Sequence, residues 1–509
     1  MKILIRTDSS ENIGTGHLMR CLALANELKN RGADVTFIAR DLRGNSNWIV
    51  EEFGFPLWQL PAHVEENQVG ELDEDYSSWL GVSKGTDALE TVQLLKNAAY
   101  LDWLIVDHYA LDRSWEEEVR PYVRKIMVID DLANRAHDCD LLLDQNVLRD
   151  NTGRYTGLVP QDCQILLGPK YALLRQEFSE ARKKLGPRSG NVKRVLVFFG
   201  GIDSSNQTLR ALQALERMGC PDIAVDVVVG AKNPNRKSIE SFCSKNTNIN
   251  IYCQTKEMPK LISEADLAIC AGGTTTWERC CLGLPGLVIS VAENQEAIAK
   301  GLAARGCQLY LGPESEVSVE AIQYALETLR RSPETLESFS RESMQLTDGL
   351  GVKRIVQLMA QPDLMLRRAT MNDCESIYRW RNDEETRRHI FDSTVIPFED
   401  HQRWFENSLK NPDQVLLVAE ATSGPVGVLR YDLKGESATI SVYLVPGGQP
   451  PGTGPQLIRS GSEWLRQNYP QVLRIFAEIL PENIASQKAF KKAGYIKNHL
   501  TYVQELNHA

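Results

Sequence analysis

The 509-residue sequence lacks several features that define common protein classes. No run approaches the roughly 18 apolar residues that a membrane span needs. The N-terminus MKILIRTDSS has no extended apolar stretch of the kind found in secretory signals. The 11 cysteines are scattered and form no CxxC pair, so neither a zinc ribbon nor a thioredoxin-type site is indicated. We therefore expect a cytoplasmic protein whose cysteines are reduced thiols, several of them buried.

A basic block is also missing. The 57 Lys and Arg residues are outnumbered by 67 Asp and Glu residues, which gives a net charge of −10. This balance argues against nucleic acid or an anionic membrane as the main partner, but leaves room for local basic pockets that bind phosphate. Hydrophobic residues at 42% and charged residues at 24% exclude a disordered or fibrous chain. At ~150 residues per domain, the length predicts about three domains.

Two successive stretches of the chain alternate short apolar runs with helical patterns. The first has predicted strands at 3–5, 34–39, 103–107 and 125–130, with a glycine-bearing loop and a helix over 18–29 after the first strand. The second follows polar residues 180–194 and has predicted strands at 194–201, 223–230, 249–254, 266–273 and 285–290. The pattern predicts an α/β fold with two doubly wound, Rossmann-like halves, residues 1–165 and 166–356. A ligand cleft is expected at the carboxyl ends of their strands.

A third unit with a different rhythm follows a predicted linker near residues 357–364. It opens with a predicted strand over 363–370 and a helix over 374–383, and continues with strands over 415–420, 424–433 and 437–446. Glycine- and proline-rich residues 447–455 then lead into a predicted helix over 456–467. This order predicts a smaller C-terminal α/β domain over residues 363–509.

The segment IGTGHLMR, residues 13–20, is the first candidate site. Gly14 and Gly16 permit close approach of a ligand to the backbone, and the following helix N-terminus favours an anion. His17 stands at the start of that helix, where its imidazole would face the bound group. The motif is neither a Walker A sequence nor a complete GxGxxG fingerprint, and a solvent-exposed capping histidine is the alternative.

The segment AGGTTTWERCC, residues 271–281, is the second candidate site. Gly272, Gly273 and Thr274 begin a small polar loop that opens a helix and is suited to binding phosphate through N–H and hydroxyl groups. Glu278 on the first turn could accept hydrogen bonds from both ribose hydroxyls. Its alternative role is to complement the helix dipole.

Other polar residues lie where the sequence places the cleft. Arg175 could reach it from just past the first half, or could form a surface ion pair with Glu177 or Glu180. Three residues at predicted strand ends could line the cleft or could serve as buried caps of loops: Asp8, Asp107 and His108.

The opening MKILIRTDSSENIGTGHLMRCLALA closely resembles the PseG family of nucleotide-sugar hydrolases. Similar segments follow in the same order over residues 1–355: LIVDHY (104–109), Asp130-Asp131, GLVP (157–160), LGPKYALLRQEF (167–178), FFGGID (198–203), AGGTTTWERCCLGLPGLVI (271–289) and AENQE (292–296). The resemblance implies a glycosyltransferase-B-like fold. It also implies hydrolysis of UDP-2,4-diacetamido-2,4,6-trideoxy-β-L-altropyranose during pseudaminic acid biosynthesis.

The resemblance assigns the chemistry to His17, which matches the family's catalytic histidine. Gly14 and Gly16 would leave space for the diphosphate and the sugar. UDP is a good leaving group, so an oriented water, a proton acceptor and stabilisation of the diphosphate suffice. No cluster in the sequence has clear metal-ligand spacing, so we expect hydrolysis without a metal.

The resemblance also implies a set of contacts with the nucleotide and the sugar. Glu278 would bind the ribose, and the backbone of Met258 would read the uracil. The amides of the AENQE loop would hold acetamido groups or the attacking water. The expected contacts are Arg175, Met258, Gly273, Thr274, Glu278, Asn294 and Gln295.

The tail resembles the GNAT N-acetyltransferase family in two motifs. Gln449 to Gly454 fits [QR]xxGxG, and NIASQKAFKKAGY (483–495) fits NxxSxxxFxxxGY. The resemblance implies that Gln449, Gly452 and Gly454 bind the pyrophosphate of acetyl-CoA and that Asn483 lies near the pantetheine arm.

The tail departs from the GNAT pattern in two respects. Phe490 replaces a tyrosine that can protonate the departing thiolate, which leaves Tyr495 or Tyr443 as possible acids. Three prolines in or beside the glycine loop also remove N–H donors: Pro450, Pro451 and Pro455.

Together these features predict a UDP-sugar hydrolase fused to the acetyltransferase that makes its substrate, with UDP-sugar and acetyl-CoA as small-molecule partners. Two other interpretations remain open. A glycosyltransferase of the same fold would need an acceptor before it released UDP. A UDP-sugar-binding module joined to a protein N-acetyltransferase would act on peptides.

Overall fold

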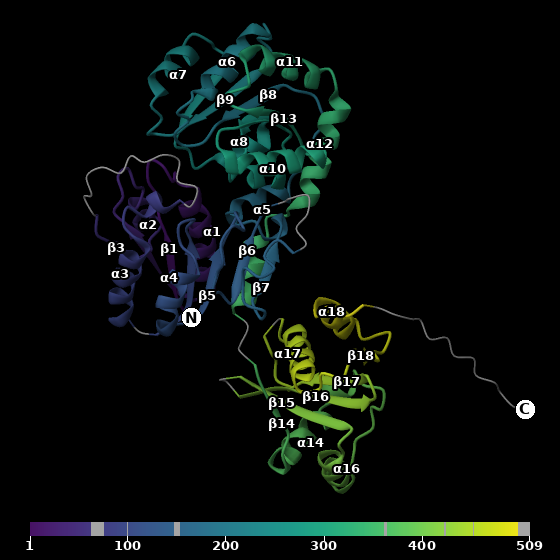
Figure 1. Cartoon of the computed structure of the whole chain (residues 1–509). Coiled ribbons are helices and arrows are strands. Elements are labelled where there is room, and N and C mark those ends of the chain that lie inside the picture. The colour runs from purple at the N-terminus through teal and green to yellow at the C-terminus, as the bar shows by residue number, and fades with distance from the viewer. Residues whose placement is uncertain are drawn as a thin grey trace, which may run out of the picture. The chain divides into compact units, whose positions relative to one another are not determined.

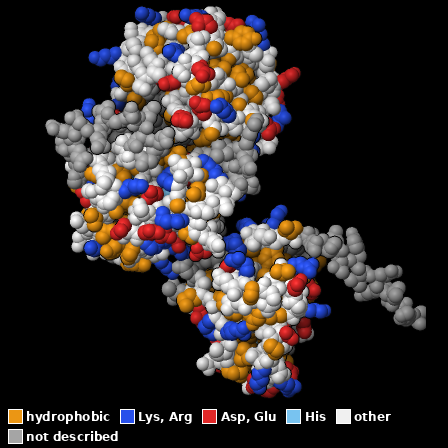
Figure 2. Space-filling model, viewed as in Figure 1, with side chains coloured by type: hydrophobic (Ala, Val, Ile, Leu, Met, Phe, Trp, Pro, Cys, Tyr) orange, Lys and Arg blue, Asp and Glu red, His pale blue; other side chains and the backbone are white. Residues whose placement is uncertain are grey.

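The computed structural model describes residues 1–62, 76–98, 100–146, 153–360, 364–421, 424–450 and 452–496. The chain divides into two compact units, Met1–Val356 and Gln357–Ala509 (Figure 1). Pro451, and the ends of the predicted C-terminal domain at 363 and 497–509, lie outside the described residues. Within the described part of the chain, no helix is both long and apolar enough to cross a membrane. On the face shown in Figure 2, basic and acidic side chains are interspersed over the surface of both units.

The first half of the N-terminal unit is built on a seven-stranded parallel sheet in the order β3-β2-β1-β4-β5-β6-β7. The strands are β1 (Lys2–Thr7), β2 (Asp34–Arg40), β3 (Leu57–Leu60), β4 (Leu101–Asp107), β5 (Val123–Ile129), β6 (Leu141–Asp144) and β7 (Gln164–Leu167). The helices of this half are α1 (Gly16–Asn30), α2 (Trp48–Glu52), α3 (Lys84–Lys96) and α4 (Arg113–Val119). The strand order reverses between β1 and β4, and such a switch point opens a crevice at the carboxyl ends of the strands.

The second half has a six-stranded parallel sheet in the order β10-β9-β8-β11-β12-β13, which reverses between β8 and β11. Its strands are β8 (Arg194–Phe198), β9 (Ala224–Val229), β10 (Ile249–Cys253), β11 (Leu267–Ala271), β12 (Gly286–Ser290) and β13 (Gln308–Pro313). The helices are α5 (Gln176–Arg182), α6 (Gln207–Arg217), α7 (Arg236–Cys243), α8 (Met258–Glu264), α9 (Thr275–Cys281), α10 (Glu293–Ala304), α11 (Val319–Arg330), α12 (Pro333–Leu346) and α13 (Gly351–Met359).

Helices cover both faces of the second sheet, and its strands are apolar on both sides for that reason. Val195 and Val197 pack with Ala211 of α6 on one face. Leu196, between them in β8, packs with Trp277 of α9 on the other face. The two-residue alternation of the strand therefore anchors α9, the helix that follows the second glycine-bearing loop.

The C-terminal unit has a five-stranded sheet in the order β14-β15-β16-β17-β18. The elements are β14 (Met365–Arg368), α14 (Cys374–Asn382), α15 (Glu384–Arg387), α16 (Phe398–Lys410), β15 (Gln414–Ala421), β16 (Gly424–Lys434), β17 (Ser437–Leu444), α17 (Thr453–Asn468), β18 (Arg474–Ala477) and α18 (Ile484–Lys492). The first three strand pairs are antiparallel, whereas β17 and β18 are parallel. Their pairing ends at Ile440 and Ala477, so β17 continues to Leu444 without β18 beside it.

A buried network of charges lies beneath the first glycine-bearing loop. Arg6 Nη1 lies 2.5 Å from Asp8 Oδ1, and Arg6 Nη2 lies 2.8 Å from Asp87 Oδ2. Arg40 Nη2 lies 2.7 Å from the same Asp87 oxygen, and the Arg40 backbone N–H donates to Asp8 at 2.7 Å. His108 Nε2 lies 3.3 Å from the other Asp8 oxygen. Asp8 and His108 therefore belong to a buried structural network and do not line a cleft.

Candidate functional site

His17 lies in the first turn of α1, directly after the loop that leaves β1. Gly14 makes this loop possible, since its φ of +73° lies in the left-handed region, and its N–H donates to the Ser10 carbonyl at 3.0 Å. His17 is only 8% exposed. The alternative of a solvent-exposed capping histidine is therefore wrong.

The His17 ring is held by Asp107, the last residue of β4. Its Nδ1 lies 2.6 Å from Asp107 Oδ1. An ionised carboxylate can only accept, so Nδ1 carries the proton and the other ring nitrogen, Nε2, is free to act as an acceptor. Burial opposes ionisation of Asp107, but the positive charge of Arg20 and the hydrogen bonds from Arg20 and His17 outweigh it and hold the pKa of Asp107 well below its usual range. Tyr109 contacts the imidazole edge-on, with ring centroids 4.6 Å apart.

Arg20, one helical turn after His17, joins Asp107 to a second carboxylate. Its Nε and Nη2 donate to the two oxygens of Asp107 at 2.7 and 2.6 Å, and its Nη1 donates to Asp131 Oδ2 at 2.6 Å. Tyr109 donates its hydroxyl to the same Asp131 oxygen at 2.8 Å. Asp107, Tyr109 and Asp131, at and after the ends of β4 and β5, thus form one hydrogen-bonded group with Arg20 around the imidazole.

The second glycine-bearing loop approaches the first one closely. A Cβ atom built on Gly16 would lie 3.0 Å from Thr274 Oγ1. Gln295 Oε1 accepts hydrogen bonds from the backbone of Gly272 and Val291, each at 3.2 Å. Gln295 therefore braces the second loop from α10, and Gly16 and Thr274 meet where the two halves face each other.

The remaining predicted contacts of the second half occupy different environments. Glu278 is partly buried on α9, and burial raises its pKa to about 7 against the opposing effect of Arg175. Arg175 lies near enough to Glu278 to lower its pKa and stacks over Phe178, 5.3 Å from the ring centroid. Among the described residues it forms no ion pair with Glu177 or Glu180. Met258 begins α8 with its side chain in the core, which leaves its backbone as the group able to meet a ligand, and Asn294 is exposed on α10.

In the C-terminal unit, the predicted glycine loop leads into α17. Gly452 adopts a φ of +99°, which favours glycine. Thr453 donates its N–H to Pro450 at 3.2 Å, and Gln456 donates its N–H to Gly452 at 3.3 Å. Pro455 has no N–H to donate, and the N–H groups of Gly452 and Gly454 have no hydrogen-bond partner among the described residues. Gln449 Nε2 donates to the Val445 carbonyl at 3.3 Å.

Asn483 and the candidate acids are engaged within the domain. Asn483 caps α18 by accepting from the Ser486 N–H at 3.0 Å, and it donates to the His389 carbonyl at 3.3 Å. Phe490 is buried and packs edge-on against Tyr495, whose hydroxyl lies 2.9 Å from that of Ser462. Tyr443, the other candidate acid, has its pKa raised by burial.

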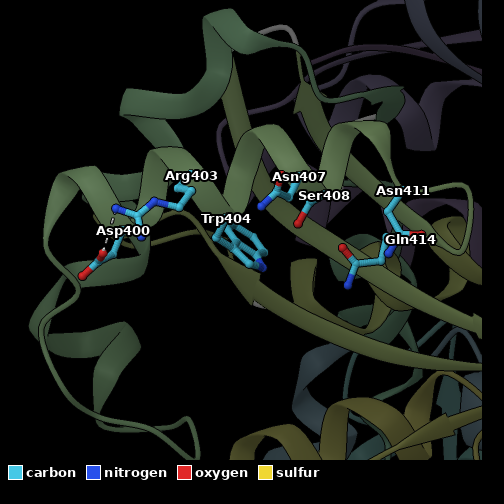
Figure 3. Close-up of a pocket in the computed structure, with 7 residues that line it drawn as sticks. All are labelled: Asp400, Arg403, Trp404, Asn407, Ser408, Asn411 and Gln414. Carbon is cyan, nitrogen blue, oxygen red and sulfur yellow. Dashed lines mark ion pairs between the residues drawn. The ribbon is translucent and has the colours of Figure 1, made fainter.

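A shallow pocket of about 430 Å³ opens on α16 and the start of β15 (Figure 3). It is lined by Asp400, Arg403, Trp404, Asn407, Ser408, Asn411 and Gln414. Gln414 of β15 pairs with Asp432 of β16, and Asp432 pairs with Thr439 near the start of β17. The loop that precedes α17 follows the other end of β17, so the pocket lies at the opposite end of the sheet from that loop. None of the predicted site residues lines it. Over the described part of the chain, no group of three or more His, Cys, Asp and Glu side chains is arranged to hold a metal.

Family models match two segments of the chain. Residues 195–358 match the glycosyltransferase family 28 C-terminal domain, and residues 363–496 match the acetyltransferase (GNAT) domain. The chain is 28% identical to UDP-2,4-diacetamido-2,4,6-trideoxy-β-L-altropyranose hydrolase of Campylobacter jejuni, and the match covers 61% of this chain and 98% of that relative. The chain joins a PseG-like hydrolase homologue to a GNAT domain. The two parallel sheets of the N-terminal unit confirm the predicted pair of doubly wound, Rossmann-like halves.

Two further relatives match the chain over different lengths. The uncharacterized protein MJ1062 of Methanocaldococcus jannaschii is 25% identical over 98% of this chain and 97% of its own length, so the match includes both units. The spore coat polysaccharide biosynthesis protein SpsG of Bacillus subtilis is 30% identical over 40% of this chain and 59% of its own length.

Several site residues were not singled out from the sequence. Arg20 stands three residues after His17, a spacing that places both on one helix face. This spacing is the feature of the sequence that could have indicated a role for Arg20 beside His17. Asn146 follows β6, a four-residue strand that is too short to stand out in the sequence. Trp277 has the apolar pattern of a core residue, and nothing in the sequence indicates what its indole N–H meets.

Proposed function

We propose that the N-terminal unit hydrolyses the anomeric bond of UDP-2,4-diacetamido-2,4,6-trideoxy-β-L-altropyranose, releasing UDP and the free sugar. The observation that carries the proposal is the pair formed by His17 and Asp107, with Nδ1 bonded to the carboxylate at 2.6 Å and Nε2 left as an acceptor. The name of the Campylobacter relative, which matches over nearly its whole length, supports this substrate.

In the proposed reaction, His17 Nε2 accepts a proton from a water molecule. The water oxygen forms a bond to the anomeric carbon as the bond from that carbon to the diphosphate oxygen breaks, and its electron pair leaves with UDP. Asp107 stabilises the imidazolium that forms. A positioned general base of this kind typically contributes ~10²–10⁴-fold to the rate.

The second half would bind the nucleotide. Gly273 and Thr274, braced by Gln295, offer N–H and hydroxyl groups for the diphosphate, and Gly16 leaves the space beside Thr274 open. Glu278 would accept the ribose hydroxyls, and Met258 would meet the uracil through its backbone. Arg175 and Asn294, which also belong to the second half, would contact the substrate. The proposal requires no metal.

We further propose that the GNAT domain acetylates the 4-amino group of the precursor UDP-sugar. The amine nitrogen would attack the thioester carbonyl of acetyl-CoA, and the sulfur would leave as CoA. Gln449, Gly452 and Gly454 lie in the loop that would hold the pyrophosphate, and Asn483 caps the helix beside it. The stretch of β17 beyond Ile440, which has no β18 partner, gives the pantetheine arm an edge of free backbone groups to bind. Orientation matters more than acid catalysis in this step, so Phe490 is compatible with activity.

The decisive experiment is mass spectrometry of the products formed from a panel of UDP-diacetamido and UDP-amino sugars, with and without acetyl-CoA. The proposal predicts UDP and free diacetamido sugar from the first group, and the same products from the 4-amino sugar only when acetyl-CoA is present. The match to glycosyltransferase family 28 makes a transferase the second candidate. Release of UDP only after an acceptor is added would favour that transferase. Acetylation of peptides instead of amino sugars would favour a protein N-acetyltransferase.

A further inference from the structure

A buried chain of hydrogen bonds leads from α9 of the second half into the first half. The indole N–H of Trp277 donates to Asn146 Oδ1 at 3.3 Å. The amide of Asn146 in turn donates to Asp131 Oδ1 at 3.0 Å. Trp277 is 2% exposed and Asn146 is 4% exposed, so the bond between them is shielded from bulk water, whereas Asp131 at the end of the second bond is partly exposed.

The series of hydrogen bonds continues from Asp131 to the His17 imidazole. Asp131 accepts from Arg20, Arg20 donates to both oxygens of Asp107, and Asp107 accepts from Nδ1 of His17. Every bond in this part measures 2.6 or 2.7 Å. These are charge-assisted bonds, which are shorter and stronger than neutral ones.

The donor and acceptor groups of the Asn146 amide fix the direction of the hydrogen bonds on either side of it. Its oxygen must face the indole N–H, which can only donate, and its NH₂ must face the Asp131 carboxylate, which can only accept. A flipped amide would oppose both neighbours. Asn146 therefore fits between one donor in the second half and one acceptor in the first half, in a single orientation.

The helix at the far end of these hydrogen bonds, α9, is the one that would carry the nucleotide contacts under the proposed function. Trp277 lies between Thr274, which precedes α9, and Glu278, on the same turn. A displacement of α9 on nucleotide binding would therefore move the indole N–H against Asn146, and through Asp131 and Arg20 would change the hydrogen bonds that orient His17.

We propose that Trp277, Asn146 and Asp131 are positioning residues that couple nucleotide binding on α9 to the orientation of His17. This inference rests on the proposed function for the site that it couples. Its content goes further, because it makes the base in one half depend on a hydrogen bond donated by the other half.

The first test compares two tryptophan variants of the full-length protein. Trp277→Phe removes the indole N–H and keeps an aromatic ring in the core. Trp115→Phe is the matched control, because its buried indole N–H donates to Asp87 at 2.9 Å and lies outside the chain of bonds. We expect kcat for UDP-sugar hydrolysis to fall about tenfold in Trp277→Phe with KM within about twofold, the loss expected when roughly one hydrogen bond no longer supports the transition state. Equal kcat values in the two variants would overturn the proposal.

A second pair of variants tests whether the residues act in series. Asn146→Leu breaks the same path at its middle. If the path is continuous, the double variant Trp277→Phe/Asn146→Leu will be no slower than Asn146→Leu alone, because the path is already broken. Rate losses that multiply in the double variant would contradict a single path.

A spectroscopic readout separates this inference from the proposed function. Full-length protein is labelled with ¹⁵N-histidine, and the His17 ring signals are assigned by their loss in His17→Asn. UDP should shift these signals in the wild type, and should shift them less than half as far in Trp277→Phe even at saturating UDP. Unchanged His17 shifts in Trp277→Phe, or no response to UDP in the wild type, would refute the coupling. Coupling without turnover of any UDP-sugar would retain this inference and reject the hydrolase.

Discussion

Replacing Gly16 with alanine tests the meeting point of the two glycine-bearing loops. The new Cβ would lie 3.0 Å from Thr274 Oγ1, whereas ordinary contacts begin at 3.4 Å, an overlap of 3.4 − 3.0 = 0.4 Å. Gly16 is the first residue of α1, so alanine fits its backbone and changes helix propensity in a favourable direction by at most about 1 kcal/mol. The overlap therefore has to be relieved by moving Thr274 or by separating the loops.

This substitution should affect catalysis more than stability. We expect the free energy of unfolding to stay within about 1 kcal/mol of the wild type. The value of kcat/KM for the UDP-sugar should fall about tenfold, because misplacement of catalytic groups by 1 Å can cost on the order of 100-fold and the overlap here is smaller. Urea unfolding and a continuous assay of UDP release measure the two quantities.

Two further variants make the reasoning on Gly16 refutable. In the double variant with Thr274→Ala the clash disappears, so its activity should exceed the product of the two single effects. Gly14→Ala is the contrasting control. Nothing lies within 4 Å of its Cβ, but its φ of +73° disfavours alanine, so it should lose stability by about 1–2 kcal/mol. Full activity in Gly16→Ala, or independent effects of Gly16 and Thr274, would show that the loops do not hold the substrate between them.

Three other changes have definite expected outcomes. His17→Asn should reduce hydrolysis by ~10²–10⁴-fold while calorimetry still detects UDP, and near-normal turnover would exclude this base. The pKa of Glu278 is raised to about 7 in the folded protein. Its contribution to the free energy of unfolding is therefore present below about pH 4.5 and is lost as pH rises through 7. UDP affinity should instead rise over pH 6–8 if the Glu278 carboxylate binds ribose. Glu278→Gln should flatten both profiles in thermal-shift and calorimetric titrations, and profiles that keep their slope would assign them to another group. Gly452→Glu should abolish acetyl-CoA binding measured by calorimetry. Gly435→Glu, at another glycine with positive φ in the β16–β17 turn, should not, and equal loss in both would indicate unfolding.

The sequence was sufficient to predict the strands that consist of compact apolar runs. Residues 103–107 and 194–198 are examples, because strands buried on both faces need no polar alternation. The short strands β6 and β7 were missed, since four residues carry too little pattern to distinguish a strand from a buried loop. As a result the predicted border at residue 165 falls inside β7, which pairs with β6 in the first sheet.

The site was predictable only where local sequence determines position. His17 and Gly14 stand in one loop, so their proximity follows from the chain itself. The contacts of His17 with Asp107 and of Arg20 with Asp131 join residues 90 and 111 positions apart, and they depend on the order of strands in the sheet. No spacing in a single sequence reports that order, so the environment of the histidine required the structure.

The buried charges beneath the first loop restrict how this protein can diverge. Arg6, Asp8, Arg40 and Asp87 share their hydrogen bonds so closely that loss of one removes a charge partner from at least one buried neighbour, and breaking a buried ion pair typically costs about 3–5 kcal/mol. That penalty is comparable to the whole stability of many domains. Descendants of this sequence should therefore keep all four residues or exchange them together, and a library that randomises one of these positions at a time should return almost only the residue already there.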